Sequence, residues 1–450
     1  MHFQKKCIFE RERRKSNADV AKKKMAFFAV FAQLLPFFRV RLSICIFLES
    51  PSMSLFSAVE MAPRDPILGL NEQFNADTNP AKVNLGVGVY YDDNGKLPLL
   101  KCVQEAEKQM AAAPKARAYL PIDGIAAYDS AVKSLVFGAD SEIVTSGRVA
   151  TVQAIGGTGG LKIGADFLKK LSPDAKVLIS DPSWENHRAM FIQAGFVVES
   201  YPYYDAENRG VNFAGMLAAL KAAAPGTIVI LHACCHNPTG YDISASDWDQ
   251  VIAVVKANRL TPFLDMAYQG FGYGIAEDGA VIGKFVAAGL NFFVSTSFSK
   301  SFSLYGERVG ALSVACASKE ECGRVLSQLK IMIRTNYSNP PTHGGTVCAM
   351  VLNTPDLRKM WEEELAEMRV RIKAMRSSFV EKLKAAGVQA DMSFITTQIG
   401  MFSYSGLSKD QMVRLRNEFG VYGTDTGRMC VAALNSKNID HVCASIAKVM

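Results

Sequence analysis

Several hallmarks of other protein classes are missing from this 450-residue sequence. Its ten cysteines contain no Cys-x-x-Cys pair, and the adjacent Cys234 and Cys235 suit neither a metal site nor an easily formed disulfide. Scattered cysteines in so long a chain are typical of reduced intracellular thiols, so we expect a cytoplasmic protein with no bound metal. Beyond residue 52 no apolar run reaches the ~18 residues of a membrane-spanning helix, so we predict no membrane-embedded part there.

Net charge is also missing from most of the chain. The formal charge of +7 is carried entirely by residues 1–52, where eleven Lys and Arg stand against four Asp and Glu. From Met53 onward the sequence holds 39 basic and 39 acidic residues. A neutral body has no bulk electrostatic attraction for nucleic acid, so we predict no nucleic-acid partner.

The first 52 residues differ from the rest in composition. A basic stretch ends at Lys24, and the apolar run that follows is interrupted by Pro36 and Arg39. This pattern allows a targeting segment, a membrane anchor or a start codon placed too early. We favour the last interpretation, with Met53 as the natural start and residues 1–52 as an extension without a defined structure.

What is present is the pattern of an α/β fold. Hydrophobic residues make up 49% and charged residues 21% of the sequence, as in globular proteins. Short apolar strands alternate with stretches of helical period, which predicts a largely parallel sheet covered on both faces. The expected strands are 176–181, 196–201, 227–232, 261–265, 291–296 and 310–314. Helices are expected at 161–168, 213–223 and 248–257, with one long helix over 355–386 and an α+β region in the last ~60 residues.

Polar residues with catalytic potential follow these strands, where ligands of such sheets bind. Asn237 follows one strand, Asp265 and Tyr268 the next, Lys300 another, and Trp184 the first. Taken singly, Lys300 could be a surface residue, Asp265 a helix cap and Trp184 part of the core. Together they point to one site, in which a lysine among hydroxyls is a candidate Schiff-base nucleophile. The histidines in the middle of the chain are interpreted as hydrogen-bonded core or loop residues: His187, His232, His236 and His343.

A glycine-rich stretch, Gly156–Gly160, precedes one expected helix. Glycines that open a helix expose backbone N–H groups to a phosphate. The spacing matches neither a dinucleotide fingerprint nor a P-loop, so it predicts a single phosphate. Ser297 and Arg308 could close on the same phosphate. A phosphate, a Schiff-base lysine, an indole for stacking and a carboxylate for a ring nitrogen together describe pyridoxal phosphate.

The same segments resemble the class I aspartate and aromatic-amino-acid aminotransferases. The motifs are Ser297-Phe-Ser-Lys300-x-Phe-Ser-Leu-Tyr-x-Glu-Arg308, His236-Asn-Pro-Thr-Gly, Asp265-x-Ala-Tyr268, Arg334-x-Asn-Tyr-Ser-Asn-Pro-Pro and Gly427-Arg428. The resemblance runs from about Met53 to the C-terminus. Segments such as Tyr119-Leu-Pro-Ile-Asp-Gly are most similar to the bacterial aromatic-amino-acid branch.

The resemblance implies a role for each matching residue. Lys300 would bind the cofactor covalently and move the proton between Cα and C4′, with Asp265 paired to the pyridinium nitrogen. Tyr268 and Asn237 would hold the phenolic oxygen, and Trp184 would stack on the ring. The phosphate would be held by Gly157, Thr158, Ser297, Arg308 and, from a partner subunit, Tyr119. The substrate would meet Trp184, Asn237, a mobile segment at Gly88, the carboxylate clamp Arg428, and the partner subunit's Arg334, which would face a side-chain carboxylate.

The resemblance also implies an architecture. It is fold type I of the pyridoxal-phosphate-dependent transferases, with a mostly parallel sheet in a large cofactor-binding domain over 99–364. A smaller α+β domain would combine 53–98 with 365–450. Active sites shared between subunits would make the protein a homodimer.

The expected activity is transfer of the amino group of aromatic amino acids and aspartate to 2-oxoglutarate by a ping-pong mechanism. The alternative is an aspartate aminotransferase with little aromatic activity, and the sequence does not rank the two. A non-catalytic binding protein is disfavoured because Lys300, Asp265 and Arg428 are all present. A lyase is disfavoured because both carboxylate-binding arginines, Arg334 and Arg428, are present.

Overall fold

The computed structural model describes residues 54–450. The interpretations placed on residues 1–52, including a start at Met53, lie outside the described residues. The chain divides into two compact units, 1–63 and 64–450, and the second holds all the helices and strands described here.

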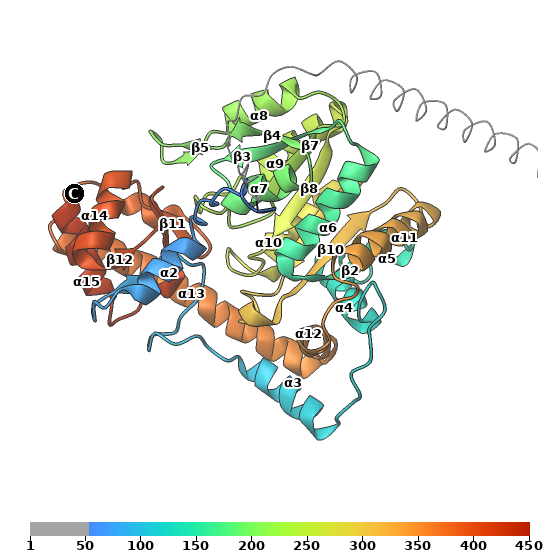
Figure 1. The fold of residues 1–450 in the computed structure, drawn as a ribbon, viewed down its shortest axis with the longest axis horizontal. Coiled ribbons are helices and arrows are strands. Elements are labelled where there is room, and N and C mark those ends of the chain that lie inside the picture. Colours follow the sequence, from blue (N-terminus) through green and yellow to red (C-terminus); the bar gives the residue numbers. More distant parts are fainter. Residues whose placement is uncertain (1–53) are drawn as a thin grey trace, which may run out of the picture. The chain divides into compact units, whose positions relative to one another are not determined.

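A seven-stranded sheet forms the centre of the second unit (Figure 1). Its strands lie in the order β2-β10-β9-β8-β7-β3-β4. Their bounds are β2 Val149–Ile155, β3 Lys176–Asp181, β4 Val197–Pro202, β7 Ile228–His232, β8 Thr261–Met266, β9 Phe292–Ser297 and β10 Val309–Ala315. Among these strands only β10 is antiparallel to its neighbours, β2 and β9. The predicted mostly parallel α/β sheet is therefore confirmed.

Continuous apolar strands fit this sheet because both of its faces are buried. In β7, Ile228 and Ile230 belong to one hydrophobic cluster, whereas Val229 and Leu231 belong to another. Alternate side chains point to opposite faces of a strand, so the two clusters are the two layers between sheet and helices.

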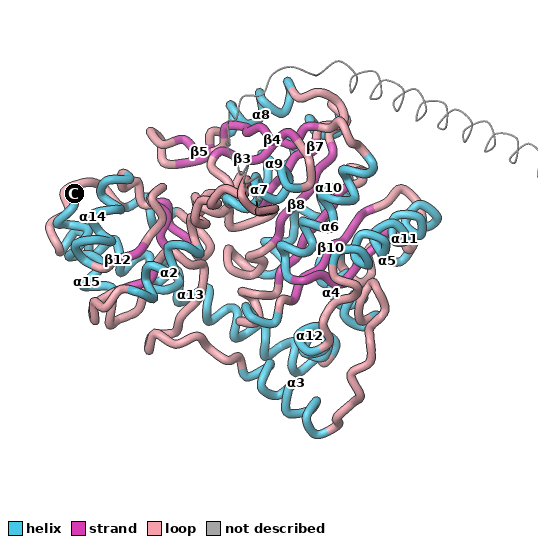
Figure 2. The backbone as a smooth tube through the Cα atoms, viewed as in Figure 1, coloured by secondary structure: helices cyan, strands magenta, loops and turns pink. Residues whose placement is uncertain are grey.

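Helices account for most of the remaining chain (Figure 2). Their bounds are α2 Leu68–Ala76, α3 Lys101–Ala112, α4 Ala126–Phe137, α5 Glu142–Thr145, α6 Gly156–Leu171, α7 Glu185–Gln193, α8 Phe213–Ala222, α9 Ala245–Ala257, α10 Ile275–Ala287, α11 Lys319–Asn336, α12 His343–Asn353, α13 Pro355–Ala385, α14 Lys409–Phe419 and α15 Ile439–Val449. Three 3₁₀ turns occur at η1 Tyr305–Glu307, η2 Ser393–Thr397 and η3 Val431–Ala433. Among the described residues, no helix is both long and apolar enough to cross a membrane.

Helix α13 joins two regions of the unit. Pro355 occupies its first turn, where a missing N–H costs nothing, and Trp361 and Leu365 are among its buried residues. The helix packs against α3 and α12 along part of its length and against α15 and η2 farther on (Figure 1). Small two-stranded sheets lie beside its later part: β1 Val83–Asn84 with β12 Val421–Tyr422, and β11 Phe402–Tyr404 with β13 Arg428–Cys430. The division into a large domain over 99–364 and a small domain from 53–98 and 365–450 stays a prediction.

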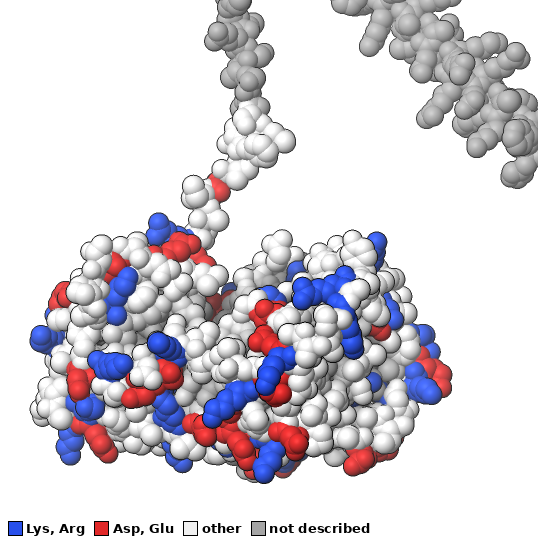
Figure 3. All heavy atoms as spheres, turned by 90° about the horizontal axis from the view of Figure 1, so that it is seen from below, with Lys and Arg blue, Asp and Glu red and all other residues white. Residues whose placement is uncertain are grey.

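The structure refines some predicted elements. The expected strands are present with ends that differ from the prediction by at most one residue, but β2 of the central sheet was not predicted. The glycine stretch does not precede a helix; Gly156–Gly160 forms the first turns of α6. Lys, Arg, Asp and Glu are interspersed over the face drawn in Figure 3, in keeping with the neutral charge of this part of the chain.

Candidate active site at the carboxyl edge of the sheet

One pocket collects side chains from the ends of β3, β7, β8 and β9 and from the start of α6. Its lining residues are Gly157, Thr158, Leu161, Trp184, His232, Asn237, Asp265, Ala267, Tyr268, Ser297, Ser299, Lys300 and Arg308. Nine of these were predicted from the sequence as cofactor ligands. The pocket forms at this edge because parallel strands end together there.

The first turn of α6 and Arg308 form an anion cradle. Gly156 has φ +66°, and a Cβ atom there would lie 2.7 Å from Nη2 of Arg308. Arg308 itself is held in a left-handed conformation, with φ +56°, and its carbonyl accepts a hydrogen bond of 3.0 Å from the Gly156 N–H. A Cβ on Gly157 would lie 3.0 Å from Cβ of Ser297. Only glycine therefore leaves room for backbone N–H groups, a hydroxyl and a guanidinium to meet one phosphate.

Lys300 lies in the same pocket, with its Nζ atom 5.0 Å from the centre of the Tyr268 ring. Burial lowers the pKa of Lys300 to about 8; Asp265 opposes this shift, and the charges of Arg308 and Arg428 add to it. A substantial fraction of the amine is consequently neutral near physiological pH. Neutral amines attack carbonyl carbons, so Lys300 is prepared for nucleophilic chemistry.

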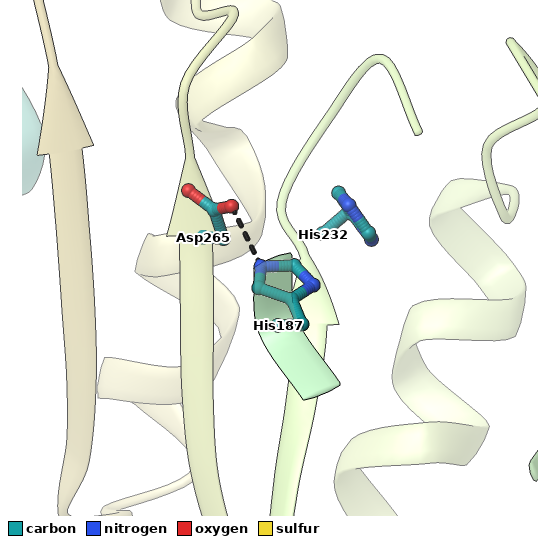
Figure 4. A group of neighbouring side chains, drawn as sticks. All are labelled: His187, His232 and Asp265. Carbon is teal, nitrogen blue, oxygen red and sulfur yellow. Dashed lines mark hydrogen bonds and ion pairs between the residues drawn. The ribbon is translucent and has the colours of Figure 1, made fainter. Parts of the chain in front are cut away.

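Asp265, at the end of β8, is 5% exposed and bonds to a histidine. Nε2 of His187 lies 2.9 Å from its Oδ2 atom, as the dashed line in Figure 4 shows, and Nδ1 of His187 lies 3.0 Å from the Ser183 hydroxyl. Burial alone would raise the pKa of Asp265, but the His187 hydrogen bond and nearby positive charge hold it below its usual value. Asp265 is therefore ionised, and His187 donates a hydrogen bond to it from Nε2.

Two further histidines lie next to His187: the ring of His232 packs near that of His187, and His236 packs on His232. Their position beside the site was not predicted. His232 lines the pocket, and His236 bonds to Ser180 at 2.9 Å and Thr239 at 2.8 Å. Burial lowers the pKa of His232 to about 3, so it is neutral, yet neither ring nitrogen has a hydrogen-bond partner among the residues that the structure describes. The prediction of hydrogen-bonded histidines is thus confirmed for His187, His236 and His343 but wrong for His232.

His187, His232 and Asp265 are close enough together to raise the question of a metal ion. Both ring nitrogens of His187 are already occupied, one by Asp265 and the other by Ser183. A metal would have to displace the Asp265 contact, so the arrangement fits a carboxylate held by hydrogen bonding better than a metal centre.

Arg428, in β13, lies beside the pocket and is 1% exposed. Its Nη1 donates to Oδ1 of Asn237 at 3.0 Å and its Nη2 to the carbonyl of Gly86 at 2.7 Å, while its Nε has no partner in the described part of the chain. The guanidinium carbon lies 4.5 Å from the centre of the Phe402 ring. A Cβ on Gly88 would come within 2.6 Å of that ring. A buried guanidinium with an unsatisfied N–H is suited to a carboxylate ligand.

Besides Gly88 and Arg428, two further predicted site residues do not line this pocket within the chain. Tyr119 is 92% exposed, on an extended segment between α3 and α4. Arg334 is exposed in the last turn of α11 and bonds to the Ser338 hydroxyl. Both were assigned to the site of a partner subunit, and that assignment stays a prediction. Sequence analysis also missed Ser299, which lines the pocket two residues after Ser297.

The sheet and its pocket define an α/β enzyme of the kind that holds a phosphorylated cofactor on a lysine. A family model described as aminotransferase class I and II matches residues 80–446. The chain belongs to this family.

Named relatives fall on both sides of the substrate question. An aspartate aminotransferase of Pseudomonas aeruginosa is 62% identical over 398 residues, 88% of this chain and all of that protein. An aromatic-amino-acid aminotransferase of Escherichia coli is 50% identical over 397 residues, again covering 88% of this chain and 100% of the relative. The crystal structure of an aromatic-amino-acid aminotransferase from Burkholderia pseudomallei, covalently bound to pyridoxal phosphate, matches with a TM-score of 0.86 and 66% identity, covering 88% of this chain and all of that one.

Proposed function

We propose that this protein is a pyridoxal-phosphate-dependent aminotransferase that moves the amino group of aspartate and aromatic amino acids to 2-oxoglutarate. The observation that carries the proposal is the meeting of Lys300, Asp265 and the anion cradle in one pocket. A lysine of lowered pKa, an ionised carboxylate and a phosphate cradle suit three separate parts of that cofactor.

The residues present fit the cofactor. A Cβ atom at Gly156 would fill part of the phosphate cradle, which supports a role for Gly157, Thr158, Ser297 and Arg308 as phosphate ligands. Tyr268 and Asn237 would hold the phenolic oxygen, and Trp184 would pack on the ring. When bound, the cofactor supplies an electron sink that stabilises negative charge at the substrate Cα. Asp265, kept ionised by His187, would hold a proton on the pyridine nitrogen and so maintain that sink.

The chain's own groups would handle the substrate and its proton. Nζ of Lys300 would remove and return the proton at the substrate Cα, because its pKa of about 8 suits both directions. Arg428 would bind the α-carboxylate, which offers a partner for its unsatisfied Nε. Trp184 and Asn237 would border the substrate, and the segment at Gly88, which packs on Phe402, would cover it.

We further propose a homodimer with shared active sites and two domains in each subunit. The large domain would be 99–364, and 53–98 with 365–450 would form the small one. Tyr119 would then reach the partner's phosphate and Arg334 the partner's substrate, which accounts for the exposure of both in a single chain. The cytoplasm is the proposed location, supported by eight free cysteines among the described residues.

A second candidate is an aspartate aminotransferase with little aromatic activity. The identity of 62% to an aspartate enzyme supports it, just as 66% to an aromatic enzyme supports the broader activity. Arg334 is compatible with both, since it would pair with a dicarboxylate and could turn away from an aromatic ring.

The deciding experiment measures kcat/KM for aspartate, tyrosine and phenylalanine with 2-oxoglutarate as acceptor. We expect all three to react, with the parallel double-reciprocal lines of a ping-pong mechanism. Turnover of aspartate alone would favour the second candidate, and no transamination of any of them would refute the proposal.

A further inference from the structure

A short hairpin between β4 and α8 contacts segment 394–406, which precedes Arg428, the proposed ligand of the substrate carboxylate. Its strands are β5 Tyr204–Asp205 and β6 Gly210–Val211. The ring of Tyr204 meets that of Tyr404 edge-on, with centroids 5.0 Å apart and an interplanar angle of 84°. Tyr204 also stacks on Tyr241, with ring centroids 6.0 Å apart. The Tyr204 ring therefore contacts both Tyr241, which follows β7, and Tyr404, which lies in β11.

Tyr404 is directly opposite Arg428 in the antiparallel pair β11–β13. Phe402, two residues earlier in β11, lies under the guanidinium group of Arg428. Residues opposite each other in such a pair hold each other's position through the shared ladder. The ring of Tyr204 thus contacts β11, the strand that pairs with β13 and so positions Arg428.

A second contact joins the same two segments. The guanidinium carbon of Arg209, at the tip of the hairpin, lies 4.6 Å from the centre of the Phe394 ring in η2. Arg209 has φ +51°, in the left-handed region that is unfavourable for such a side chain. Gly406 has φ +75°, a conformation that favours glycine, and a Cβ atom there would come within 2.2 Å of Nη1 of Arg209. The hairpin therefore contacts segment 394–406 near its start, at Phe394, and near its end, at Tyr404 and Gly406.

The contact of Tyr204 is made by its ring and not by its hydroxyl. The Tyr204 hydroxyl is buried and has no hydrogen-bond partner within the described range 54–450. A buried unpaired hydroxyl costs free energy, so it cannot be what favours tyrosine over phenylalanine at this contact. Replacing Tyr204 by phenylalanine therefore removes the hydroxyl while keeping the ring contact, and replacing it by leucine removes both.

We propose that Tyr204 and Tyr404 are positioning residues, whose edge-on ring contact fixes the β11–β13 pair so that Arg428 faces the substrate carboxylate. Neither ring is assigned a contact with the substrate. The inference rests on the proposed role of Arg428 and adds the hairpin as the element that orders it.

The test measures binding of succinate, an unreactive dicarboxylate, to the holoenzyme by calorimetry, together with KM and kcat for aspartate. An edge-on aromatic pair is worth about two- to tenfold in an equilibrium constant. We expect Tyr204→Leu to raise both the succinate Kd and the aspartate KM by about three- to tenfold. The kcat should stay within about twofold, because the lost contact stabilises the bound ground state and the transition state equally. Tyr204→Phe keeps the ring and should match the wild type.

A double-mutant cycle and a matched control complete the design. Tyr404→Leu should raise the succinate Kd similarly, and Tyr204→Leu/Tyr404→Leu should add little to either single change. Phe285→Leu breaks a buried pair with Trp248, 6.0 Å between centroids, elsewhere in the unit, and should lower the urea midpoint without changing the Kd.

Three results would overturn the inference: an unchanged succinate Kd in Tyr204→Leu, an equal loss in Tyr204→Phe, or strictly additive effects in the cycle. Failure of the proposed function is distinguishable, because the wild-type protein would then bind no succinate at all.

Discussion

Two regions of the molecule carry predicted site residues: the edge of the central sheet, and the exposed surface with Tyr119 and Arg334. In the first region one chain brings the residues together, whereas in the second they stay exposed. At the sheet edge, Asp265 is hydrogen-bonded to His187, Arg308 lies beside Gly156, and Lys300 lines the same pocket. Tyr119 is 92% exposed, and Arg334 bonds only to the nearby Ser338 among the described residues. Among the described residues, a tyrosine and an arginine so exposed contribute little to the packing of the chain.

This difference separates the chemistry from the choice of substrate. Residues that would act on the amino group line one pocket at the sheet edge within a single chain, so their geometry is set by folding of that chain. Tyr119 and Arg334 are instead proposed to reach the phosphate and the side-chain carboxylate in the site of a second subunit, so their positions depend on how two subunits assemble. We therefore expect changes at the sheet edge to affect every substrate, and changes at Arg334 to affect only dicarboxylic ones.

The largest effect should follow from Lys300→Ala. Loss of the amine that carries the cofactor and moves the Cα proton should lower kcat by about four powers of ten or more for all substrates. Steady-state assays measure the loss, and the visible absorbance of lysine-bound pyridoxal phosphate should disappear. Lys176→Ala is the matched control, because Lys176 is exposed at the start of β3 and pairs with Glu199. Wild-type turnover by the Lys300→Ala protein would contradict the assignment.

Asp265→Ala comes next. Removing one partner of a buried charge pair costs about 3–5 kcal/mol. At ~1.4 kcal/mol per tenfold, kcat should fall by about two to three powers of ten. The phosphate cradle is untouched, so the dissociation constant of the cofactor, measured by dialysis and absorbance, should change by less than about tenfold.

Asp166→Ala removes a carboxylate that pairs with Lys162 on α6, and it should leave kcat unchanged. If Asp265→Ala instead loses cofactor as steeply as it loses turnover, Asp265 has a structural role.

The sequence was sufficient for the sheet edge because the signals there are local. Each predicted strand is an apolar run, and Asp265 and Lys300 follow directly at its end, so their convergence follows from parallel topology. His187 and His232 were missed as parts of the site, since nothing local tells a histidine in a core from one against a functional carboxylate. The contact of Tyr204 with Tyr404 joins residues 200 positions apart and has no periodic signature.

Arg334→Leu should have a smaller and selective effect. If Arg334 faces the side-chain carboxylate of aspartate, its loss strands that charge at about 3–5 kcal/mol. The kcat/KM for aspartate should fall by about two to three powers of ten. Phenylalanine brings no side-chain charge, so its kcat/KM should stay within about tenfold of wild type.

The competing explanation is that Arg334 only stabilises contact between subunits. It predicts equal losses for both substrates and a weaker dimer, which sedimentation would detect. Arg324→Leu, on the same helix α11 and also exposed, controls for loss of a surface arginine and should change neither ratio.

The smallest effect should come from deleting residues 1–52. The aminotransferase family model begins at residue 80, and relatives matched over their full length cover 88% of this chain. Every residue proposed for the site lies beyond Met53, from Gly88 to Arg428. A protein that starts at Met53 should therefore keep kcat/KM for aspartate and phenylalanine within about twofold, with the same urea midpoint. The deletion also removes the entire formal charge of +7, so weaker retention on a cation-exchange column would confirm that the basic stretch is gone. A truncated protein that misfolds or loses activity would show that these residues take part in the enzyme and would rule out a start codon placed too early.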